Sequence, residues 1–181
     1  YKRQLQTIGH YRPGIPTDMT TTMGAIVSKT QWEKIRNYIN IARAEGATLA
    51  YGGGVPNDPK LAKGWFIEPT VFTDVKQTMR IANEEVFGPI LSVLRWDNED
   101  DLFAQVNAVE YGLTSSIWTT QLANAHRAAG RVQAGYVWVN HVSSHFIGAS
   151  FGGYKQSGIG REEGFDELLT YSQHKNVHVV I

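Results

Sequence analysis

The sequence predicts an α/β protein with three layers, in which helices cover both faces of a mostly parallel sheet. Two observations support this class. Stretches with a helical spacing of apolar residues alternate with short apolar runs that fit strands. The segments between successive runs are too long for hairpins, and parallel strands need such long connections. Ligands of such sheets bind beyond the carboxyl ends of the strands, so we expect the functional residues there.

The strongest helix signal covers residues 29–46. Its apolar residues recur at spacings of three and four: Trp32, Ile35, Tyr38, Ile39 and Ala42. Ser28 is suited to cap the first turn, and Gly46 is suited to end the last. Upstream, residues 1–10 fit the end of another helix, and residues 11–22 fit an extended connector.

The later elements repeat the alternation. Apolar or β-branched runs predict strands at residues 47–51, 65–75, 90–96, 113–119, 135–140 and 177–181. Asn98 and the three acids after it predict a capped helix start. Two further helices are expected at 122–132 and 161–171. The second of these should turn Phe165, Leu168 and Leu169 inward.

Length and composition narrow the functional classes. The 181 residues predict one domain, which can bury roughly 70% of its unfolded surface. Lys plus Arg and Asp plus Glu each number 17, and the basic residues are scattered, which argues against nucleic acid or an anionic membrane as partner. No apolar run approaches the ~18 residues of a membrane helix. We expect a cytoplasmic chain, although the first residue is Tyr and a leader upstream stays an open alternative.

Cysteine is absent from the sequence. Its absence removes disulfides, thiolate metal sites and a thiolate nucleophile from the chemistry of these 181 residues.

The segment 83–89 places two adjacent carboxylates, Glu84 and Glu85, close to the ring of Phe87. Gly88 and Pro89 then force the backbone out of helix before a strand. An ionised carboxylate at a strand mouth can accept both hydroxyls of a sugar diol, and a nearby ring can stack on a flat heterocycle. The alternative is a solvated acidic turn with Phe87 as an ordinary core residue.

Two motifs resemble those of the NAD(P)-dependent aldehyde dehydrogenases. The segment 83–89 is similar to their E-E-[IV]-F-G-P motif, and the segment 151–158, Phe-Gly-Gly-Tyr-Lys-Gln-Ser-Gly, is similar to P-F-G-G-x-K-x-S-G. The phrases 68–71, Glu-Pro-Thr-Val, and 111–113, Tyr-Gly-Leu, also fit. The resemblance extends from about Met23 to Val180 and is weaker before that.

The resemblance implies a cofactor site. By position, Glu85 takes the hydroxyls of the nicotinamide ribose and Phe87 packs near the nicotinamide. Gln31 and Lys34 match helix positions that reach the same ribose. A solvated helix face beside Trp32 is the alternative for these last two residues.

The resemblance also implies substrate contacts. Phe151 matches an aromatic residue of the aldehyde tunnel, and Ser143 and His145 fall in the loop that the family varies to select substrates. Ser150 stands where the family usually has proline. His141 and His145 could suggest a metal site, but no third ligand accompanies them, and loop polarity is the better account.

Two further features belong to turns. Asn140 ends a strand, where its amide can pin the following turn through backbone hydrogen bonds. The segment 158–160, Gly-Ile-Gly, could suggest a phosphate cradle, but it lacks a third glycine at the right spacing and is assigned to a tight turn.

The resemblance implies that this chain holds only some of the residues needed for catalysis and that the others lie upstream. In the family, a cysteine nucleophile and a glutamate base precede the matched part, so they would lie before Tyr1. Residues 1–172 would be part of the catalytic domain and residues 173–181 an oligomerisation strand. We expect an NAD- or NADP-linked homo-oligomeric enzyme that oxidises an aldehyde to an acid, with this chain inactive alone. The alternative is a non-catalytic module that self-associates or complements a separate amino-terminal half.

Overall fold

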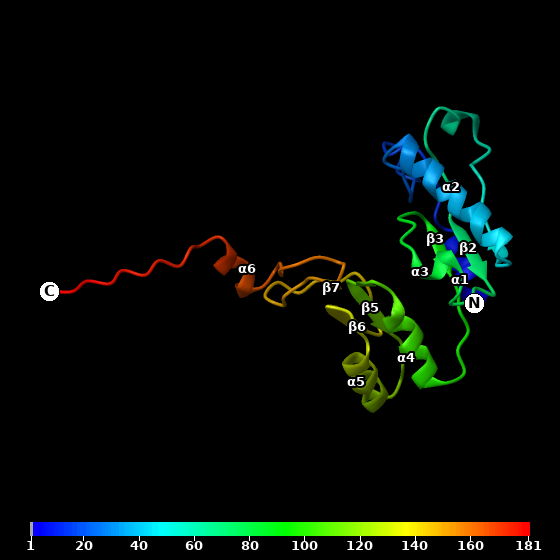
Figure 1. Ribbon diagram of the computed structural model, residues 1–181. Helices are drawn as coiled ribbons and strands as arrows, with labels where there is room; N and C mark the ends of the chain where they lie inside the picture. The colour runs from blue at the N-terminus through cyan, green and yellow to red at the C-terminus, as the bar shows by residue number, and fades with distance from the viewer. Residues whose placement is uncertain (1) are drawn as a thin grey trace. The chain divides into compact units, whose positions relative to one another are not determined.

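The computed structural model describes residues 2–181, and the chain divides into two compact units. The first unit is Tyr1–Asp97 and the second is Asn98–Ile181 (Figure 1). Each unit combines helices with a parallel pair of strands, as the predicted α/β class requires. Antiparallel pairs occur as well, which the simple alternation of elements did not predict.

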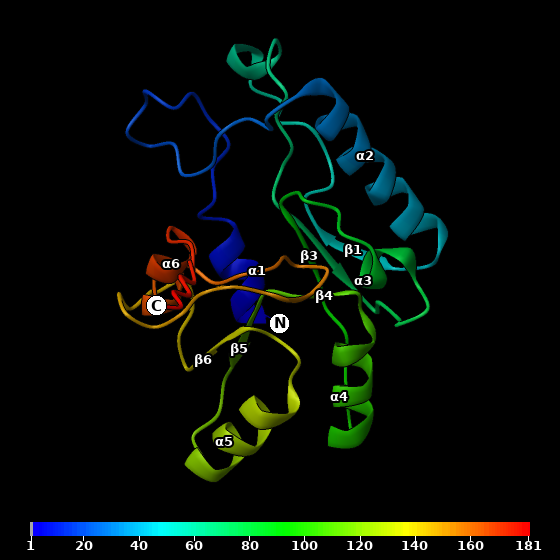
Figure 2. The ribbon, with the colours of Figure 1, turned by 60° about the vertical axis from the view of Figure 1, so that its left-hand side comes forward.

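The first unit is built around a three-stranded sheet and one long helix (Figure 2). In chain order its elements are α1 (Lys2–Ile8), α2 (Lys29–Ala44), β1 (Thr48–Tyr51), the 3-10 turn η1 (Pro59–Leu61), β2 (Thr70–Thr73), α3 (Arg80–Asn83) and β3 (Ile90–Ser92). The strand order is β1-β2-β3, with β1 antiparallel and β3 parallel to β2. Between β1 and β2 the chain forms only η1, so no crossover helix returns it to a parallel start.

Helix α2 has the caps and the buried stripe that its sequence predicts. The Ser28 hydroxyl accepts a hydrogen bond from the Gln31 backbone N–H at 3.2 Å. Gly46 follows the helix with φ +94°, a left-handed conformation that suits glycine. Four of the five predicted apolar positions are buried: Ile35, Tyr38, Ile39 and Ala42.

This stripe packs into the apolar core of the first unit. The buried residues of the core are Ile35, Ile39, Ala42, Ala47, Ile67, Phe72, Val75, Met79 and Ile81. Full burial of a Val, Ile, Phe or Met side chain stabilises a fold by roughly 1.5–3 kcal/mol. The core therefore fixes α2 against the residues that lead to the segment 84–88.

The second unit has shorter strands and a smaller core. Its elements are α4 (Glu99–Ala108), β4 (Tyr111–Gly112), β5 (Thr114–Ile117), α5 (Leu122–Arg131), β6 (Tyr136–Val139), β7 (Tyr154–Lys155) and α6 (Phe165–Thr170). Strands β5 and β6 are parallel, and β4 and β7 are antiparallel. Within the described residues, its buried hydrophobic side chains are Ala125, Ala134 and Trp138.

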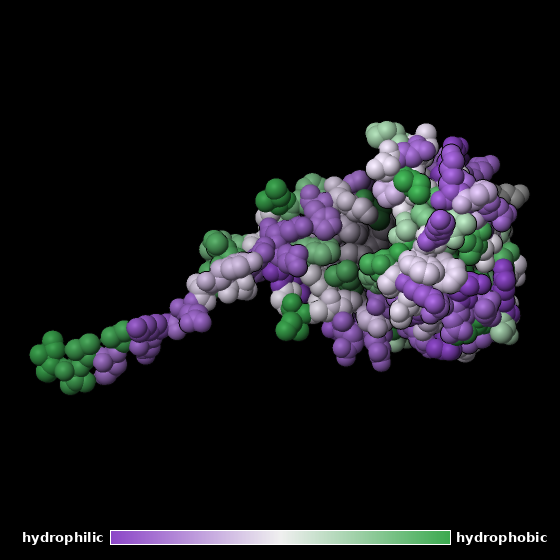
Figure 3. Space-filling model, turned by 90° about the horizontal axis from the view of Figure 1, so that it is seen from above, coloured by the Kyte–Doolittle hydropathy of each residue, from purple (hydrophilic) through white to green (hydrophobic). Residues whose placement is uncertain are grey.

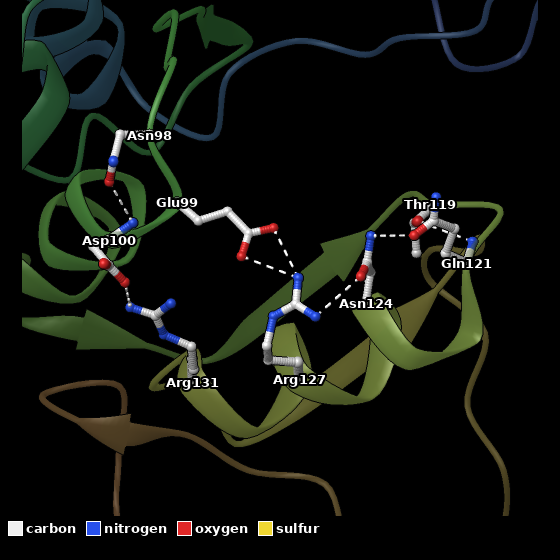
Figure 4. A network of polar contacts seen from close by, with 8 residues as sticks. All are labelled: Asn98, Glu99, Asp100, Thr119, Gln121, Asn124, Arg127 and Arg131. Carbon is white, nitrogen blue, oxygen red and sulfur yellow. Dashed lines mark hydrogen bonds and ion pairs between the residues drawn. The ribbon is translucent and has the colours of Figure 1, made fainter.

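A polar network joins α4 to α5 in this unit (Figure 4). Arg127 donates to both carboxylate oxygens of Glu99 at 3.1 Å, and Arg131 donates to Asp100 at 2.7 Å. The side chain of Asn98 caps α4, as predicted, by accepting from the backbone N–H groups of Asp100 and Asp101. Helices α4 and α5 are thus joined by polar contacts, whereas the elements of the first unit are joined by its apolar core.

The carboxy-terminal part of the chain differs from the prediction. Helix α6 spans six residues, and its Phe165, Leu168 and Leu169 are 70%, 63% and 52% exposed, so the prediction that they face inward was wrong. The described residues of the second unit place no apolar surface over them. After α6 the chain is extended, and Figure 3 shows apolar side chains gathered at its end.

Residues 173–181 form no strand within the described chain. Their proposed pairing with another chain stays a prediction. Across residues 2–181, none of the helices combines the length and the apolar character needed to cross a bilayer.

Candidate functional site

The segment 84–88 lies between α3 and β3, and we call it the rim. Gly88 comes so close to α2 that an added Cβ would lie 2.6 Å from a side-chain carbon of Ile35. Phe87 has φ +54°, a left-handed conformation that costs a non-glycine residue roughly 1–2 kcal/mol. Its ring is 72% exposed, so it is not the core residue of the alternative interpretation.

Glu84 is bound within the protein. Its carboxylate accepts from the Arg80 guanidinium at 2.7 and 2.8 Å and from the Tyr38 hydroxyl. The Arg80 hydrogen bonds, followed by that of Tyr38, lower the pKa of Glu84 to about 2. The same contact with Glu84 raises the pKa of Tyr38. Glu84 therefore ties α3 to α2 and has little capacity left for a ligand.

Glu85 has the opposite surroundings. It is exposed, and among residues 2–181 its carboxylate has no hydrogen-bond or ion-pair partner. Two neighbouring acids of the same type thus differ in availability. Only Glu85 presents both oxygens to a ligand.

Gln31 and Lys34 hold the rim from α2. The Gln31 side-chain amide donates to the carbonyls of Val86 and Phe87, each at 2.9 Å. The Lys34 ammonium donates to the carbonyl of Glu85 at 2.8 Å. The four predicted cofactor residues therefore lie together, and the two helix residues contact the backbone of the other two.

The loop 141–150 follows β6 in the second unit. Asn140, at φ +52°, accepts from the Thr119 N–H at 2.9 Å and donates to the Thr119 carbonyl at 2.8 Å. The amide thus makes backbone hydrogen bonds, as predicted, but with Thr119, so it joins the carboxyl ends of β5 and β6 and does not pin the following turn. The Trp138 indole donates to the Ser144 carbonyl at 2.6 Å and holds the middle of the loop.

His145 and Phe151 belong to a cluster of rings. We call Tyr136, Trp138, His145 and Phe151 the aromatic cluster, with ring centroids 4.6–6.0 Å apart. The imidazole of His145 stacks on Tyr136 with an interplanar angle of 17°. Phe151 also borders a hollow whose walls include Leu113 and Arg161. Ser143 is exposed and lies outside the cluster.

Some residues of these sites were not predicted from the sequence. Arg80 could have been found, because it precedes Glu84 by four residues, the spacing of a helical ion pair. Tyr38 was assigned to the core, and only the fold brings its hydroxyl to Glu84. Glu163, whose carboxylate lies 2.7 Å from the Nδ1 atom of His145, carries no comparable signal in the sequence.

The helices and parallel strand pairs define an α/β protein with a free acid beside a free ring on its rim. Comparisons with known proteins identify the family. The family model described as "Aldehyde dehydrogenase family" matches residues 2–177. The chain therefore belongs to the aldehyde dehydrogenase family.

Individual relatives agree. Aldehyde dehydrogenase tropH of Talaromyces stipitatus is 49% identical over 172 residues, which are 93% of this chain and 33% of that protein. Betaine aldehyde dehydrogenase of Brucella anthropi is 47% identical over 178 residues, 98% of this chain and 37% of that protein. The chain thus spans about a third of the length of the curated relatives it matches.

Solved structures confirm the predicted fold class. Betaine aldehyde dehydrogenase of Staphylococcus aureus in complex with NAD+ matches with a TM-score of 0.89 and 38% identity, over 94% of this chain and 34% of that one. The NAD+ complex of an aldehyde dehydrogenase from Bacillus cereus matches with a TM-score of 0.88 and 40% identity, over 95% of this chain and 34% of that one.

Proposed function

We propose that this chain is the carboxy-terminal part of an NAD(P)-dependent aldehyde dehydrogenase, which oxidises an aldehyde to a carboxylic acid. One observation carries the proposal: the backbone of the rim is tied to α2, while the Glu85 carboxylate and the Phe87 ring stay free. The NAD+ complexes of two solved relatives support NAD or NADP as the cofactor.

The rim residues fit a nicotinamide nucleotide. A carboxylate has only acceptors, so Glu85 can take both hydroxyls of a ribose diol and fix the sugar. The exposed ring of Phe87 offers an apolar face to a flat heterocycle. When bound, the nicotinamide supplies the acceptor for the hydride that the aldehyde loses.

Gln31 and Lys34 remain candidates for ribose contacts, with defined atoms. Both amide protons of Gln31 are engaged by rim carbonyls, which leaves its Oε1 as an acceptor. Lys34 uses one of its three donors on Glu85, which leaves two. We propose that the pair first positions the rim and then completes the ribose site with these remaining atoms.

We propose that Ser143, His145 and Phe151 contact the aldehyde. The support is that Ser143 and His145 lie in the loop that follows β6, and that the rings of His145 and Phe151 pack against Tyr136 of that strand. Phe151 borders a hollow, and the imidazole of His145 contacts the Phe151 ring and the Glu163 carboxylate. Ser143 contributes an exposed hydroxyl.

The chain alone should be inactive, because its 181 residues contain no cysteine to act as the nucleophile. The test incubates the purified chain with NAD+ and an aliphatic aldehyde and records absorbance of the reduced nicotinamide. No rate above that of the Glu85→Ala variant is expected. Turnover well above that control would overturn the missing-nucleophile argument.

The cofactor role of Glu85 is tested in the complete enzyme that includes this chain. Glu85→Gln should raise the KM for the cofactor about ten- to a hundredfold, as expected for weakened charge-assisted hydrogen bonds. Glu84→Gln is the matched control, because Glu84 is bound to Arg80 and Tyr38. Equal effects of the two variants on that KM would refute the assignment.

The second candidate is a self-associating or complementing module, and the exposed apolar carboxy-terminal part favours it. Val177, Val179 and Val180 are 71%, 71% and 83% exposed. An unpaired apolar segment of this kind can add to the sheet of another chain. Light scattering at tens of micromolar should show a species larger than a monomer. Deletion of residues 173–181 should return it to a monomer, and a clean monomer in both forms would exclude this candidate.

A further inference from the structure

The loop 141–150 is fastened to the turn 158–164 by a residue that has no assigned role. Glu163 uses three groups at once. Its carboxylate lies 2.7 Å from Nδ1 of His145, its carbonyl accepts from the Gly148 N–H at 2.8 Å, and its N–H donates to the Glu167 carboxylate at 2.8 Å. It therefore contacts the loop at two points and is itself anchored to α6.

The backbone at Glu163 is strained, which indicates that the surrounding contacts hold it in place. Its φ is +64°, in the left-handed region that a non-glycine residue rarely adopts. Next to it, Glu162 exchanges two backbone hydrogen bonds with Phe151, at 2.7 and 2.8 Å. These bonds fasten the chain directly after the loop 141–150 to the residue before Glu163 and so hold Glu163 beside the loop.

The contact with Glu163 determines the chemistry of the His145 ring. An ionised carboxylate only accepts hydrogen bonds, so Nδ1 must carry the proton. In neutral imidazole, Nε2 is then left as an acceptor. Stacking on Tyr136 and contact with Phe151 fix the plane of the ring. Among the described residues, Nε2 has no hydrogen-bond partner of its own.

We propose that Glu163 is a positioning residue that sets the tautomer and orientation of His145, so that Nε2 reads a hydrogen-bonding group on the aldehyde. The inference rests on the proposed aldehyde role of the loop 141–150. It names a substrate class, small aldehydes with a hydroxyl that donates to Nε2, in preference to alkyl aldehydes of the same size. Glu163 acts through His145 and need not touch the substrate.

The first experiment measures the tautomer in the chain itself. Nitrogen-15 chemical shifts of His145 in the 181-residue chain should show a protonated Nδ1 in its neutral ring. In Glu163→Met, the shifts should change toward the Nε2–H form that free histidine prefers. Glu163→Gln should retain the Nδ1–H form, because its amide oxygen still accepts.

The matched control is Glu162→Met, because the Glu162 side chain has no hydrogen-bond partner among the described residues. It should leave the His145 shifts unchanged. Both methionine variants keep a non-glycine residue at their position, so the left-handed strain at 163 stays the same. An unchanged His145 spectrum in Glu163→Met overturns the positioning role and leaves the proposed enzyme function untouched.

The second experiment measures selectivity in the complete enzyme. Glycolaldehyde and propanal have the same number of heavy atoms and differ in the hydroxyl. The ratio of their kcat/KM values should fall about three- to tenfold in Glu163→Met, the value of one net hydrogen bond, and recover in Glu163→Gln. A changed tautomer with an unchanged ratio would overturn the specificity role of His145. If the wild-type enzyme oxidised neither aldehyde, that result would instead count against the proposed function.

Discussion

The rim and the loop 141–150 are held in different ways. The rim rests on a core of nine buried residues and is tied to α2 by two long side chains. The loop is held by rings, by Asn140 and by Glu163, in a unit with three buried hydrophobic side chains among those described. The hydrogen bonds of the rim are thus made from elements that a large apolar core holds together. The loop depends on a few polar contacts, each of which can be removed singly.

The largest expected effect lies in the first unit. Phe72 is fully buried, and Phe72→Ala should lower the free energy of unfolding by about 3–5 kcal/mol. Phe146 is 64% exposed in the loop, so Phe146→Ala should stay within about 0.5 kcal/mol. Urea denaturation of the chain, followed by circular dichroism, measures both. Similar losses would remove the contrast between the two regions.

A smaller effect is expected at Asn140. Asn140→Ala removes both hydrogen bonds to Thr119 and places alanine at φ +52°, which together should cost about 2 kcal/mol. Asn140→Gly loses the same bonds without the backbone strain and should recover part of the loss. Hydrogen exchange of β5 and β6 amides is the measurement. Protection in both variants equal to that of the wild type would show that the pin does not stabilise this sheet.

The effect of Glu84 should be confined to acid. Its pKa is about 2 in the fold against an ordinary 4.5, so its ion pair stabilises fully above pH 4.5 and is lost as the pH falls toward 2. Denaturant titrations of the wild type should show falling stability across that window. Glu84→Gln should flatten this part of the profile, whereas Glu85→Gln should leave it as in the wild type. An unchanged profile in Glu84→Gln would refute the structural role.

The smallest effect is expected in the network of Figure 4. Arg127 and Glu99 have side chains 48% and 42% exposed, so Arg127→Ala should cost only about 0.2–1 kcal/mol. Because salt screens exposed charges, the difference from the wild type should shrink between 0.05 and about 0.5 M NaCl. Denaturation at both salt concentrations checks this. A cost above about 2 kcal/mol at either concentration would show a tighter coupling of α4 and α5 than the exposures indicate.

The sequence predicted those features that a local pattern can determine. The stripe of α2 and the Ser28 and Asn98 caps each follow from neighbouring residues, and each is confirmed. The Asn140 amide bonds to Thr119, 21 positions away, which no local pattern predicts. The α6 pattern looked equally amphipathic, yet Phe165 is exposed, because spacing identifies an apolar face without identifying what covers it. The antiparallel β1–β2 pair was missed for a similar reason, since a long connection does not guarantee a crossover.

The four predicted rim residues lie together, and the resemblance assigned the ligand role to Glu85, but the residues alone do not explain why Glu84 is bound. Glu84 and Glu85 are the same residue type in sequence. The spacing of four residues indicates the Arg80–Glu84 pair in the sequence, but only the fold brings the Tyr38 hydroxyl to the same acid. Glu163 depends likewise on the fold, because it meets His145 from 18 positions away.

The left-handed backbone at Phe87 sets thermal stability against ligand binding at this position. Phe87→Gly would relieve the strain and remove a largely exposed ring, so a screen for heat tolerance should favour it. The same exchange would delete the surface that we assign to the heterocycle. Selection of this chain for heat tolerance would therefore tend to replace Phe87 early.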